Sequence, residues 1–231
     1  DTLDFFIYVP PVVASTAPVD GATGINYTNA GVAITFSKSM DTNTLTANMD
    51  NTCSGSVQVS ADNFSTCVAM TSSTPQFFIS DTLVMVTAAV PLSGGSVYRI
   101  RVLNTAKDSF GYPLPATYTS TTGFTTIPDV TPPILGAVIS LTNVRNRELT
   151  INWGAATDDS TVSANLQYKV VKDNTSTANI NTVALADAKT GTDLIQDWQS
   201  GTTAKVATGL NATTAYHFAV LVRDSAGNRA L

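Results

Sequence analysis

Hydrophobic and polar residues alternate along short stretches of this chain, and turn-forming residues separate the stretches. In the first half the alternating stretches are Val12–Ser15, Val32–Phe36, Val57–Ser60, Leu83–Thr87, Val97–Val102 and Gly123–Thr126. A period of two residues is that of a β-strand with one buried face, and Gly, Asn, Asp, Pro and Ser stand between the stretches. The pattern and its spacing predict a β-sandwich.

The second half repeats this pattern. It predicts strands over Leu135–Leu141, Glu148–Trp153, Leu166–Lys172, Thr203–Thr208 and Ala215–Arg223. One stretch differs, because Thr182–Lys189 is rich in Ala and predicts one or two turns of helix. The whole chain is therefore expected to be all-β.

A proline-rich segment separates the two halves. Residues 125–136 contain three prolines and a glycine, which is typical of a short, stiff linker. We place the domain boundary near Asp129. The predicted order is a tail (residues 1–9), a first domain (10–127), a linker (128–133) and a second domain (134–231). The tail carries the apolar run Phe5 to Tyr8, which we expect to be buried.

The halves share a pattern before their last turn. Tyr98 and Tyr216 each follow a Leu by six residues, and each precedes an alternating run that ends in Asp-Ser-x-Gly. We expect each ring to pack inward and each hydroxyl to bond upstream main chain, as in a tyrosine corner. In the turns, Asp is expected to bond local amides and Gly to supply a positive φ.

Composition and charge exclude several classes of protein. Ser and Thr make up about a quarter of the chain and Glu148 is its only Glu, so strong helix formers are scarce. The net charge is −5 and Lys and Arg do not cluster, which argues against a nucleic-acid partner. No stretch approaches the roughly 20 apolar residues of a transmembrane segment.

The chain begins at Asp1, without an initiator Met or an export signal. We therefore expect a fragment or a mature form. Membrane anchoring is expected only through lipidation upstream of the given residues.

The two cysteines, Cys53 and Cys67, lie in short alternating segments of the first half. If these segments are neighbouring strands, the thiols can form a disulfide that stabilises by about 3 kcal/mol. The alternative is two buried free thiols. Zinc is disfavoured because no His is near. A disulfide would indicate an extracytoplasmic location.

Several stretches carry a family resemblance. PVDGATGI and AITFSKSMD, in residues 10–127, are similar to signatures of the bacterial Ig-like domain of S-layer proteins. LTINWGAATDDST and GLNATTAYHFAVLVRDSAGN, in residues 130–231, resemble a fibronectin type III module of bacterial cell-surface proteins and lipoproteins. The pairing is similar to spirochaete surface proteins. The resemblance implies two tandem immunoglobulin-like β-sandwiches, the second of which lacks most of its last strand.

The resemblance implies a non-enzymatic module of a bacterial cell-surface or secreted protein. Such a module would space or present a surface for a protein or matrix ligand, although a fold alone does not establish function. The alternative is an accessory spacer or carbohydrate-binding region of a larger secreted polysaccharide-active enzyme.

Catalysis is not indicated by any motif. The only histidine, His217, is expected in the middle of a strand, and no motif pairs it with a nucleophilic Ser or Cys. The nucleophile-elbow, phosphate-loop and zinc-protease motifs are also absent from the sequence. Asp158 and Asp159 are adjacent, which does not suit a glycosidase pair. We therefore expect no enzyme and no catalytic residues.

One acidic group is a candidate metal site. In a fibronectin-type sandwich the loops after the Trp153 strand and the Tyr216 strand emerge at the end that the linker enters. Asp158, Asp159 and Asp224 could there meet Asp129 and supply the oxygen ligands of calcium. The alternative is that these side chains satisfy loop amides. Of the two tryptophans, Trp153 is expected in the core, and Trp198 is the candidate for an exposed carbohydrate-binding patch.

Overall fold

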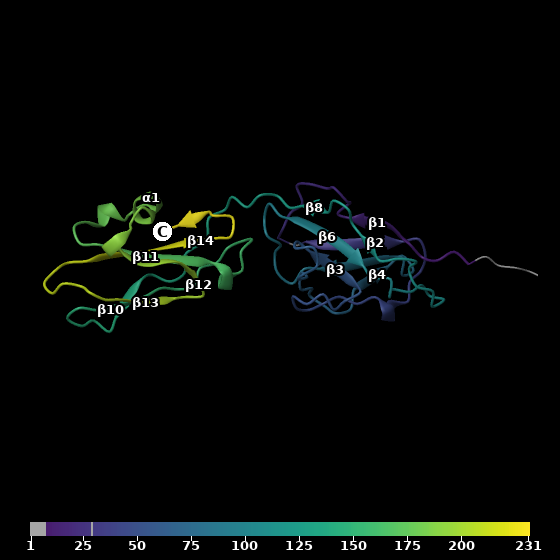
Figure 1. Cartoon of the computed structure of the whole chain (residues 1–231), viewed down its shortest axis with the longest axis horizontal. Coiled ribbons are helices and arrows are strands. Elements are labelled where there is room, and N and C mark those ends of the chain that lie inside the picture. Colours follow the sequence, from purple (N-terminus) through teal and green to yellow (C-terminus); the bar gives the residue numbers. More distant parts are fainter. Residues whose placement is uncertain (1–7, 29) are drawn as a thin grey trace, which may run out of the picture. The chain divides into compact units, whose positions relative to one another are not determined.

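The structure, a computed structural model, describes residues 8–28 and 30–231. It is all-β, as predicted, and divides into two compact units, Asp1–Pro128 and Asp129–Leu231, which are described separately (Figure 1). The division falls inside the segment that the sequence assigns to the linker. The expected burial of Phe5 to Ile7 concerns residues outside the described part of the chain.

The first unit is built from two antiparallel sheets. One has the strand order β1-β2-β5-β4, and the other has the order β3-β6-β7, with β8 also pairing with β6. The strands are β1 (Val13–Ala17), β2 (Gly31–Phe36), β3 (Val57–Ser60), β4 (Gln76–Phe78), β5 (Leu83–Thr87), β6 (Val97–Val102), β7 (Tyr118–Thr119) and β8 (Phe124–Thr125).

Alternate residues of these strands form the core of the first unit. In β2 the buried positions are Val32, Ile34 and Phe36, which is the period-two pattern read from the sequence. The same cluster contains Ile100 of β6 and Val84 of β5. Burial of a side chain of this size contributes about 1.5–3 kcal/mol, so these alternating positions supply much of the stability of the sandwich.

Asp20, in the PVDGATG stretch, ties the start of the unit to its last strand. Its carboxylate accepts hydrogen bonds from the main-chain N–H groups of Gly123 (2.6 Å), Thr122 (2.9 Å) and Thr121 (3.0 Å). The bond from Gly123, with the other two, lowers the pKa of Asp20. Gly123 has a φ of 84°, and a Cβ there would lie 2.4 Å from the Tyr98 carbonyl oxygen, so glycine is required.

The second unit is also a pair of sheets. Their orders are β13-β10-β9 and β12-β11-β14-β15. The strands are β9 (Ser140–Thr142), β10 (Leu149–Asn152), β11 (Gln167–Asp173), β12 (Leu194–Ser200), β13 (Ala204–Ala207), β14 (His217–Arg223) and β15 (Arg229–Ala230). Between the sheets lies a cluster that includes Ile151, Trp153, Leu166, Tyr168 and Val220.

The predicted helical turn is present as α1 (Val183–Asp187). Thr182 is its N-cap, and its hydroxyl accepts a hydrogen bond from the Leu185 amide at 3.3 Å. Ala186 is buried against Ile180 and Leu221, in a second cluster on the outer face of the β14 sheet. The insertion between β11 and β12 thus covers part of this sheet.

The expected strand Leu135–Leu141 is wrong over most of its length. Of the expected strand, only Ser140 and Leu141 pair with β10, as part of β9 (Ser140–Thr142). Before it, the main chain of Gly136 passes so close to Gly154 and Ala155 that a Cβ at Gly136 would lie 2.4 Å from the Ala155 oxygen. Gly154 also donates to the carbonyl of Ala137 at 3.3 Å. In this stretch the two chain segments approach each other closely, and they do not form the regular hydrogen-bond pattern of paired strands.

Candidate functional site

Cys53 and Cys67 form a disulfide, with Cα atoms 5.1 Å apart, so both are oxidised rather than free. The segment that the disulfide closes contains β3. At the end of this segment the amides of Cys67 and Val68 donate hydrogen bonds to the carbonyl oxygens of Asn51 (3.0 Å) and Val59 (2.8 Å), respectively. The disulfide therefore closes a loop that contains β3. It does not join two paired strands, because neither cysteine lies in a strand.

A carboxylate organises the loop inside this disulfide. Asp62 accepts hydrogen bonds from the amide and hydroxyl of Thr66, at 2.9 and 2.7 Å, and from the hydroxyl of Ser60 at 2.8 Å. The Thr66 amide bond is the largest of the effects that lower the pKa of Asp62 to about 2. Asp62 is therefore ionised at neutral pH and acts as a structural acceptor.

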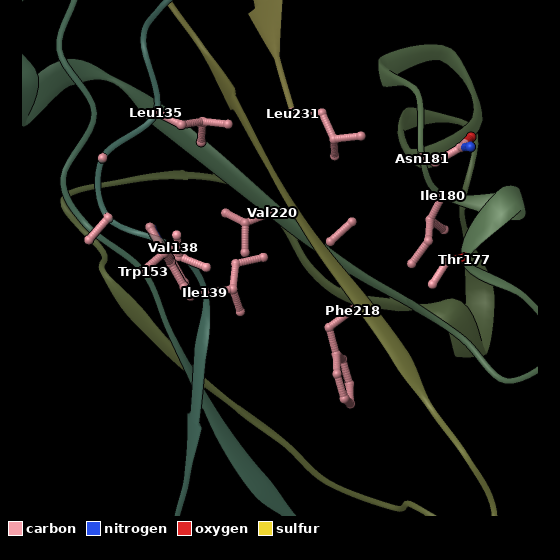
Figure 2. A pocket seen from close by; sticks show the side chains of 13 residues that line it. Leu135, Val138, Ile139, Trp153, Thr177, Ile180, Asn181, Phe218, Val220 and Leu231 are labelled. Atoms are coloured by element: carbon pink, nitrogen blue, oxygen red, sulfur yellow. The ribbon is translucent and has the colours of Figure 1, made fainter.

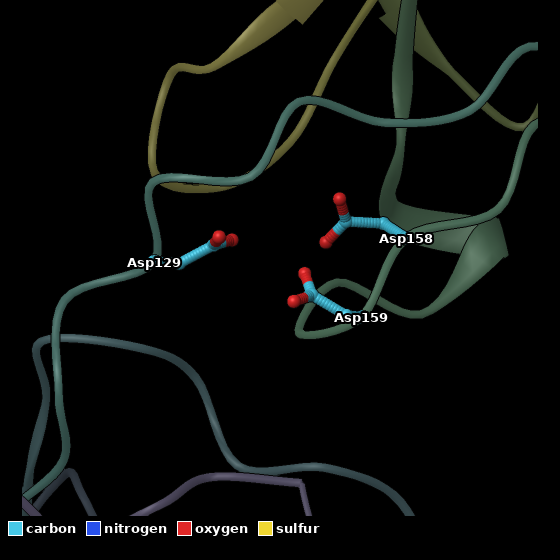
Figure 3. A group of neighbouring side chains, drawn as sticks. All are labelled: Asp129, Asp158 and Asp159. Atoms are coloured by element: carbon cyan, nitrogen blue, oxygen red, sulfur yellow. The ribbon is translucent and has the colours of Figure 1, made fainter.

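Three of the four predicted metal ligands meet in the second unit. Asp129, Asp158 and Asp159 each place one carboxylate oxygen within 4.8 Å of the other two (Figure 3). Figure 3 shows the three side chains pointing toward one another, Asp129 from the start of the unit and the other two from the loop after β10. Asp129 is only 6% exposed, whereas Asp159 is at the surface.

Local hydrogen bonds position the two less exposed carboxylates. Asp129 accepts from the amide of Thr131 at 2.9 Å and from the hydroxyl of Ser160. Asp158 Oδ2 accepts from the amides of Ser160 (3.1 Å) and Thr161 (2.7 Å). This is an Asx-type turn, which explains why the loop after β10 folds as it does.

The other oxygen of Asp158 is different. Asp158 Oδ1 is buried and has no hydrogen-bond partner among the described residues. A buried carboxylate oxygen without a partner costs free energy, since its hydration is lost and nothing replaces it. Carboxylates this close also repel one another, and a bound cation would offset both costs.

Asp224 is not a member of the group, contrary to the four-ligand arrangement expected from the sequence. Its carboxylate accepts from the amide and the side chain of Asn228, at 2.8 and 2.9 Å. The Asn228 side chain also donates to the carbonyl of Asp129 at 3.2 Å. Asp224 therefore shapes the turn after β14, in which Gly227 has a φ of 93°, and Asn228 links that turn to Asp129.

Sequence reasoning missed Ser160 and Asn228, which connect the acidic group to its surroundings. The Asp-Asp-Ser-Thr spacing carries a signal for Ser160, because an Asp commonly bonds the amides two and three residues ahead. Asn228 has no comparable signal, since its contact with Asp129 spans 99 residues.

The family model of the bacterial Ig-like domain matches residues 8–126 of the sequence. The chain belongs to this family. The matched residues are nearly all of the first unit, so the bacterial Ig-like domain contains the Cys53–Cys67 disulfide and the Asp20 network, whereas the acidic group lies beyond it. No curated protein is similar to the chain by sequence.

The solved structures that match the chain are distant from it in sequence and in geometry. Over 96% of this chain the matches include a stretch of titin domains (12% identity, TM-score 0.31) and the FN1–FN3 domains of chicken CNTN1 (13%, 0.33). A third is the N-terminal part of the bacterial S-layer protein SbsC (13%, 0.36). The chain spans 63%, 66% and 42% of these three chains, respectively.

Both tryptophans lie outside the bacterial Ig-like domain, and neither offers an open ring face of the kind that stacks on sugars. Trp153 is 7% exposed and packs against Tyr168, with ring centroids 5.7 Å apart. Trp198 is half-buried under two guanidinium groups, those of Arg223 (4.5 Å from the ring centroid) and Arg229 (5.9 Å). The geometry does not favour Trp198 as a carbohydrate site.

The single histidine also lies outside the bacterial Ig-like domain. His217 is the first residue of β14, is half-buried and pairs with Asp173 of β11 in the strand register. Across residues 8–28 and 30–231, the structure contains no helix long and apolar enough to cross a membrane.

Proposed function

We propose that this chain is a non-enzymatic module of a bacterial cell-surface or secreted protein, which spaces or presents a binding surface. The observation that carries the proposal is the tandem of two sandwich units, the first of which belongs to the bacterial Ig-like domain family. The disulfide supports an extracytoplasmic location, because such bonds persist in oxidising compartments. Protein or matrix ligands are the proposed partners.

Surface exposure is tested with antibodies raised against the chain. They are applied to intact and to permeabilised bacteria that carry the gene. We expect labelling of intact cells that is lost after external protease treatment. Labelling that requires permeabilisation would contradict the proposal.

The presenting role is tested separately, on surfaces coated with fibronectin, laminin or collagen. Retention of the purified chain on one of these, against an albumin-coated control, supports a matrix ligand. Equal retention on albumin would argue for a spacing role alone.

We also propose that Asp129, Asp158 and Asp159 bind calcium. The supporting observation is the buried Asp158 Oδ1, which has no hydrogen-bond partner in the part of the chain that the structure describes, in a carboxylate that lies close to two others. Calcium takes six to eight oxygen ligands, so the three carboxylates would leave positions for water and neighbouring carbonyls. Isothermal titration with calcium chloride tests this proposal, with Asp158→Asn as the variant that should lose the heat of binding. An unchanged titration of that variant would contradict it.

A further inference from the structure

The two units contain cavities of different chemistry. A cavity of about 440 Å³ in the second unit is lined mostly by apolar side chains, among them Leu135, Ile139 and Phe218, and by no charged residue (Figure 2). A cavity of about 320 Å³ in the first unit has a polar and charged lining, and we call it the β6 pocket. It is formed by Ser60, Ala61, Asp62, Asn63, Val97 and Arg99. Sites for small ligands have volumes of about 300–1,000 Å³ and orient their ligands through a few polar groups, which the β6 pocket provides.

Strand β6 divides its side chains between the core and this pocket. Tyr98 and Ile100 are buried in the core, and Val97 and Arg99 alternate with them, so they lie on the outer face of the sheet. Val97 is 48% exposed and gives the pocket an apolar wall. The main chain of β6 already pairs with β3, β7 and β8. A ligand of the β6 pocket therefore has to be held by side chains, which disfavours an added strand.

The opposite wall is a loop with an unusual backbone conformation. Asn63 and Phe64 are consecutive residues with φ of 58° and 65°, in the left-handed region. Asn enters this region more readily than other residues, whereas a bulky residue such as Phe rarely does. The disulfide, the hydrogen bonds of Asp62 and the Arg101 guanidinium, 3.9 Å from the centre of the Phe64 ring, hold the loop in place. Strained segments that are fixed in this way cluster at binding sites, where they position side chains before a ligand arrives.

Arg99 is the positive charge of the β6 pocket. Its guanidinium donates to Asn63 Oδ1 at 3.4 Å and forms no ion pair within residues 8–28 and 30–231. Asp20 interacts with this charge at longer range, but its own oxygens accept from three main-chain amides. A guanidinium has five N–H donors in a planar fork that matches a carboxylate. The remaining donors of Arg99 are therefore suited to a carboxylate of a ligand.

Asp62 adds a hydrogen-bond acceptor to the same pocket. Its exposed carboxylate receives hydrogen bonds from Ser60 and Thr66. An ionised carboxylate has about four acceptor positions, so a hydroxyl group of a ligand can donate to it as well. A second carboxylate is repelled by Asp62 and attracted by Arg99. The lining thus fits a ligand that carries its negative charge at Arg99, hydroxyl groups at Asp62 and apolar C–H groups at Val97.

We propose that the β6 pocket binds an acidic sugar, a pyranose ring that carries a carboxylate, as the end residue of a glycan. The carboxylate of the sugar accepts from the Arg99 guanidinium and the Asn63 amide, a ring hydroxyl donates to Asp62, and the C–H face of the ring packs on Val97. The inference rests on the proposed presenting role, for which it names a ligand class. It is tested on the purified chain, so its failure leaves the surface-labelling and matrix-retention tests unaffected.

The test is a titration of the whole isotope-labelled chain, followed by NMR. The probes are the methyl glycosides of glucuronate and galacturonate, and the controls are methyl glucoside and methyl galactoside, which carry a hydroxymethyl group in place of the carboxylate. We expect saturable shifts of the amides of residues 60–64 and 97–99 with at least one acidic probe, and binding about tenfold weaker or less with its neutral counterpart. Equal binding of acidic and neutral sugars, or no shift with either acidic probe, overturns the proposal.

Two matched variants locate the binding. Arg99→Gln removes the positive charge of the β6 pocket, and Lys107→Gln removes one from an exposed position of the same unit that does not line the pocket. We expect Arg99→Gln to weaken binding of the acidic probe about tenfold or more, and Lys107→Gln to leave it unchanged. An equal loss in both variants would indicate a general effect of net charge and would contradict the proposal.

A third variant separates ligand binding from loop structure. Glycine adopts the φ of 58° at position 63 without strain, so Asn63→Gly should not lower the free energy of unfolding of the first unit. It nevertheless removes the side-chain amide that faces the ligand, so binding of the acidic probe should weaken severalfold. If Asn63→Gly binds the probe as tightly as the original chain does, the proposed arrangement of the ligand is wrong.

Discussion

The phenolic oxygen of Tyr98 accepts a hydrogen bond from the main-chain N–H of Ser93 at 2.9 Å. The second unit repeats the arrangement, because Tyr216 accepts from the amide of Asn211, also at 2.9 Å. In each bond the donor and the acceptor are five residues apart. The first bond lies at the start of β6, which pairs with β3, and the second at the start of β14, which pairs with β11. The tyrosine corners predicted from the sequence are confirmed, and they fix the entry to β6 and to β14.

Removing the hydroxyl should destabilise the first unit more than the second. We expect Tyr98→Phe to lower the free energy of unfolding by about 1 kcal/mol, because one hydrogen bond to a main-chain amide is lost. Tyr216→Phe should have a smaller effect, since its surroundings are more exposed. The measurement is urea unfolding, with Tyr112→Phe, half exposed and stacked on Tyr8, as control.

The strands best predicted from sequence are those with one buried face. β5 and β6 begin and end as the alternation indicated, since every second side chain is buried. β3 also has the predicted bounds, although all four of its residues are buried. β12 was missed, because Asp197 and its polar neighbours break the alternation of a strand whose outer residues contact solvent. β7 and β15 are only two residues long, too short for any periodicity.

The candidate site was predictable to the same degree. Asp129, Asp158 and Asp159 could be brought together from topology, because fold class determines which loops share an end. The exclusion of Asp224 was not predictable. Asp224 is held by hydrogen bonds from the main-chain amide and the side chain of Asn228, and no sequence pattern distinguishes this turn from a metal-binding loop.

Loss of the disulfide should destabilise the first unit and leave the second unchanged. A disulfide that closes a loop of this size stabilises by about 3 kcal/mol. Both tryptophans lie in the second unit, so their fluorescence reports on that unit only. We expect chemical reduction, or the double substitution Cys53→Ser and Cys67→Ser, to lower the free energy of unfolding of the first unit. Hydrogen exchange of the amides in that unit measures the change. A matching shift in the tryptophan transition would show that the units are coupled.

Asp173 should make the second unit sensitive to acid. The ammonium group of Lys189, 2.5 Å away, and the Thr175 and Ser176 hydrogen bonds hold the pKa of Asp173 far below its usual value. A lowered folded-state pKa stabilises the unit above the unfolded pKa of about 3.9, and this stabilisation disappears as pH falls further. Tryptophan-detected urea unfolding between neutral pH and pH 3 should therefore show a falling midpoint. Asp173→Asn should flatten the profile and Asp197→Asn should not.

Calcium should stabilise the second unit selectively. If the dissociation constant lies near 1 mM, as in extracellular modules, about 10 mM calcium adds roughly 1.4 kcal/mol to the free energy of unfolding. The tryptophan-detected melting temperature should then rise with calcium, while the transition of the first unit stays in place. Asp158→Asn should abolish the rise, because it removes one charge from the group and converts a carboxylate oxygen to an amide nitrogen.

The decisive comparison for calcium is between Asp158 and Asp224. The turn-forming role of Asp224 predicts that Asp224→Asn lowers the melting temperature in the absence of calcium but keeps the calcium-dependent rise. Asp158→Asn should do the reverse, since relief of repulsion within the acidic group offsets the loss at its own turn. If both variants lose the rise together, Asp224 contributes to binding and the three-carboxylate site is wrong. If both keep it, calcium binds elsewhere.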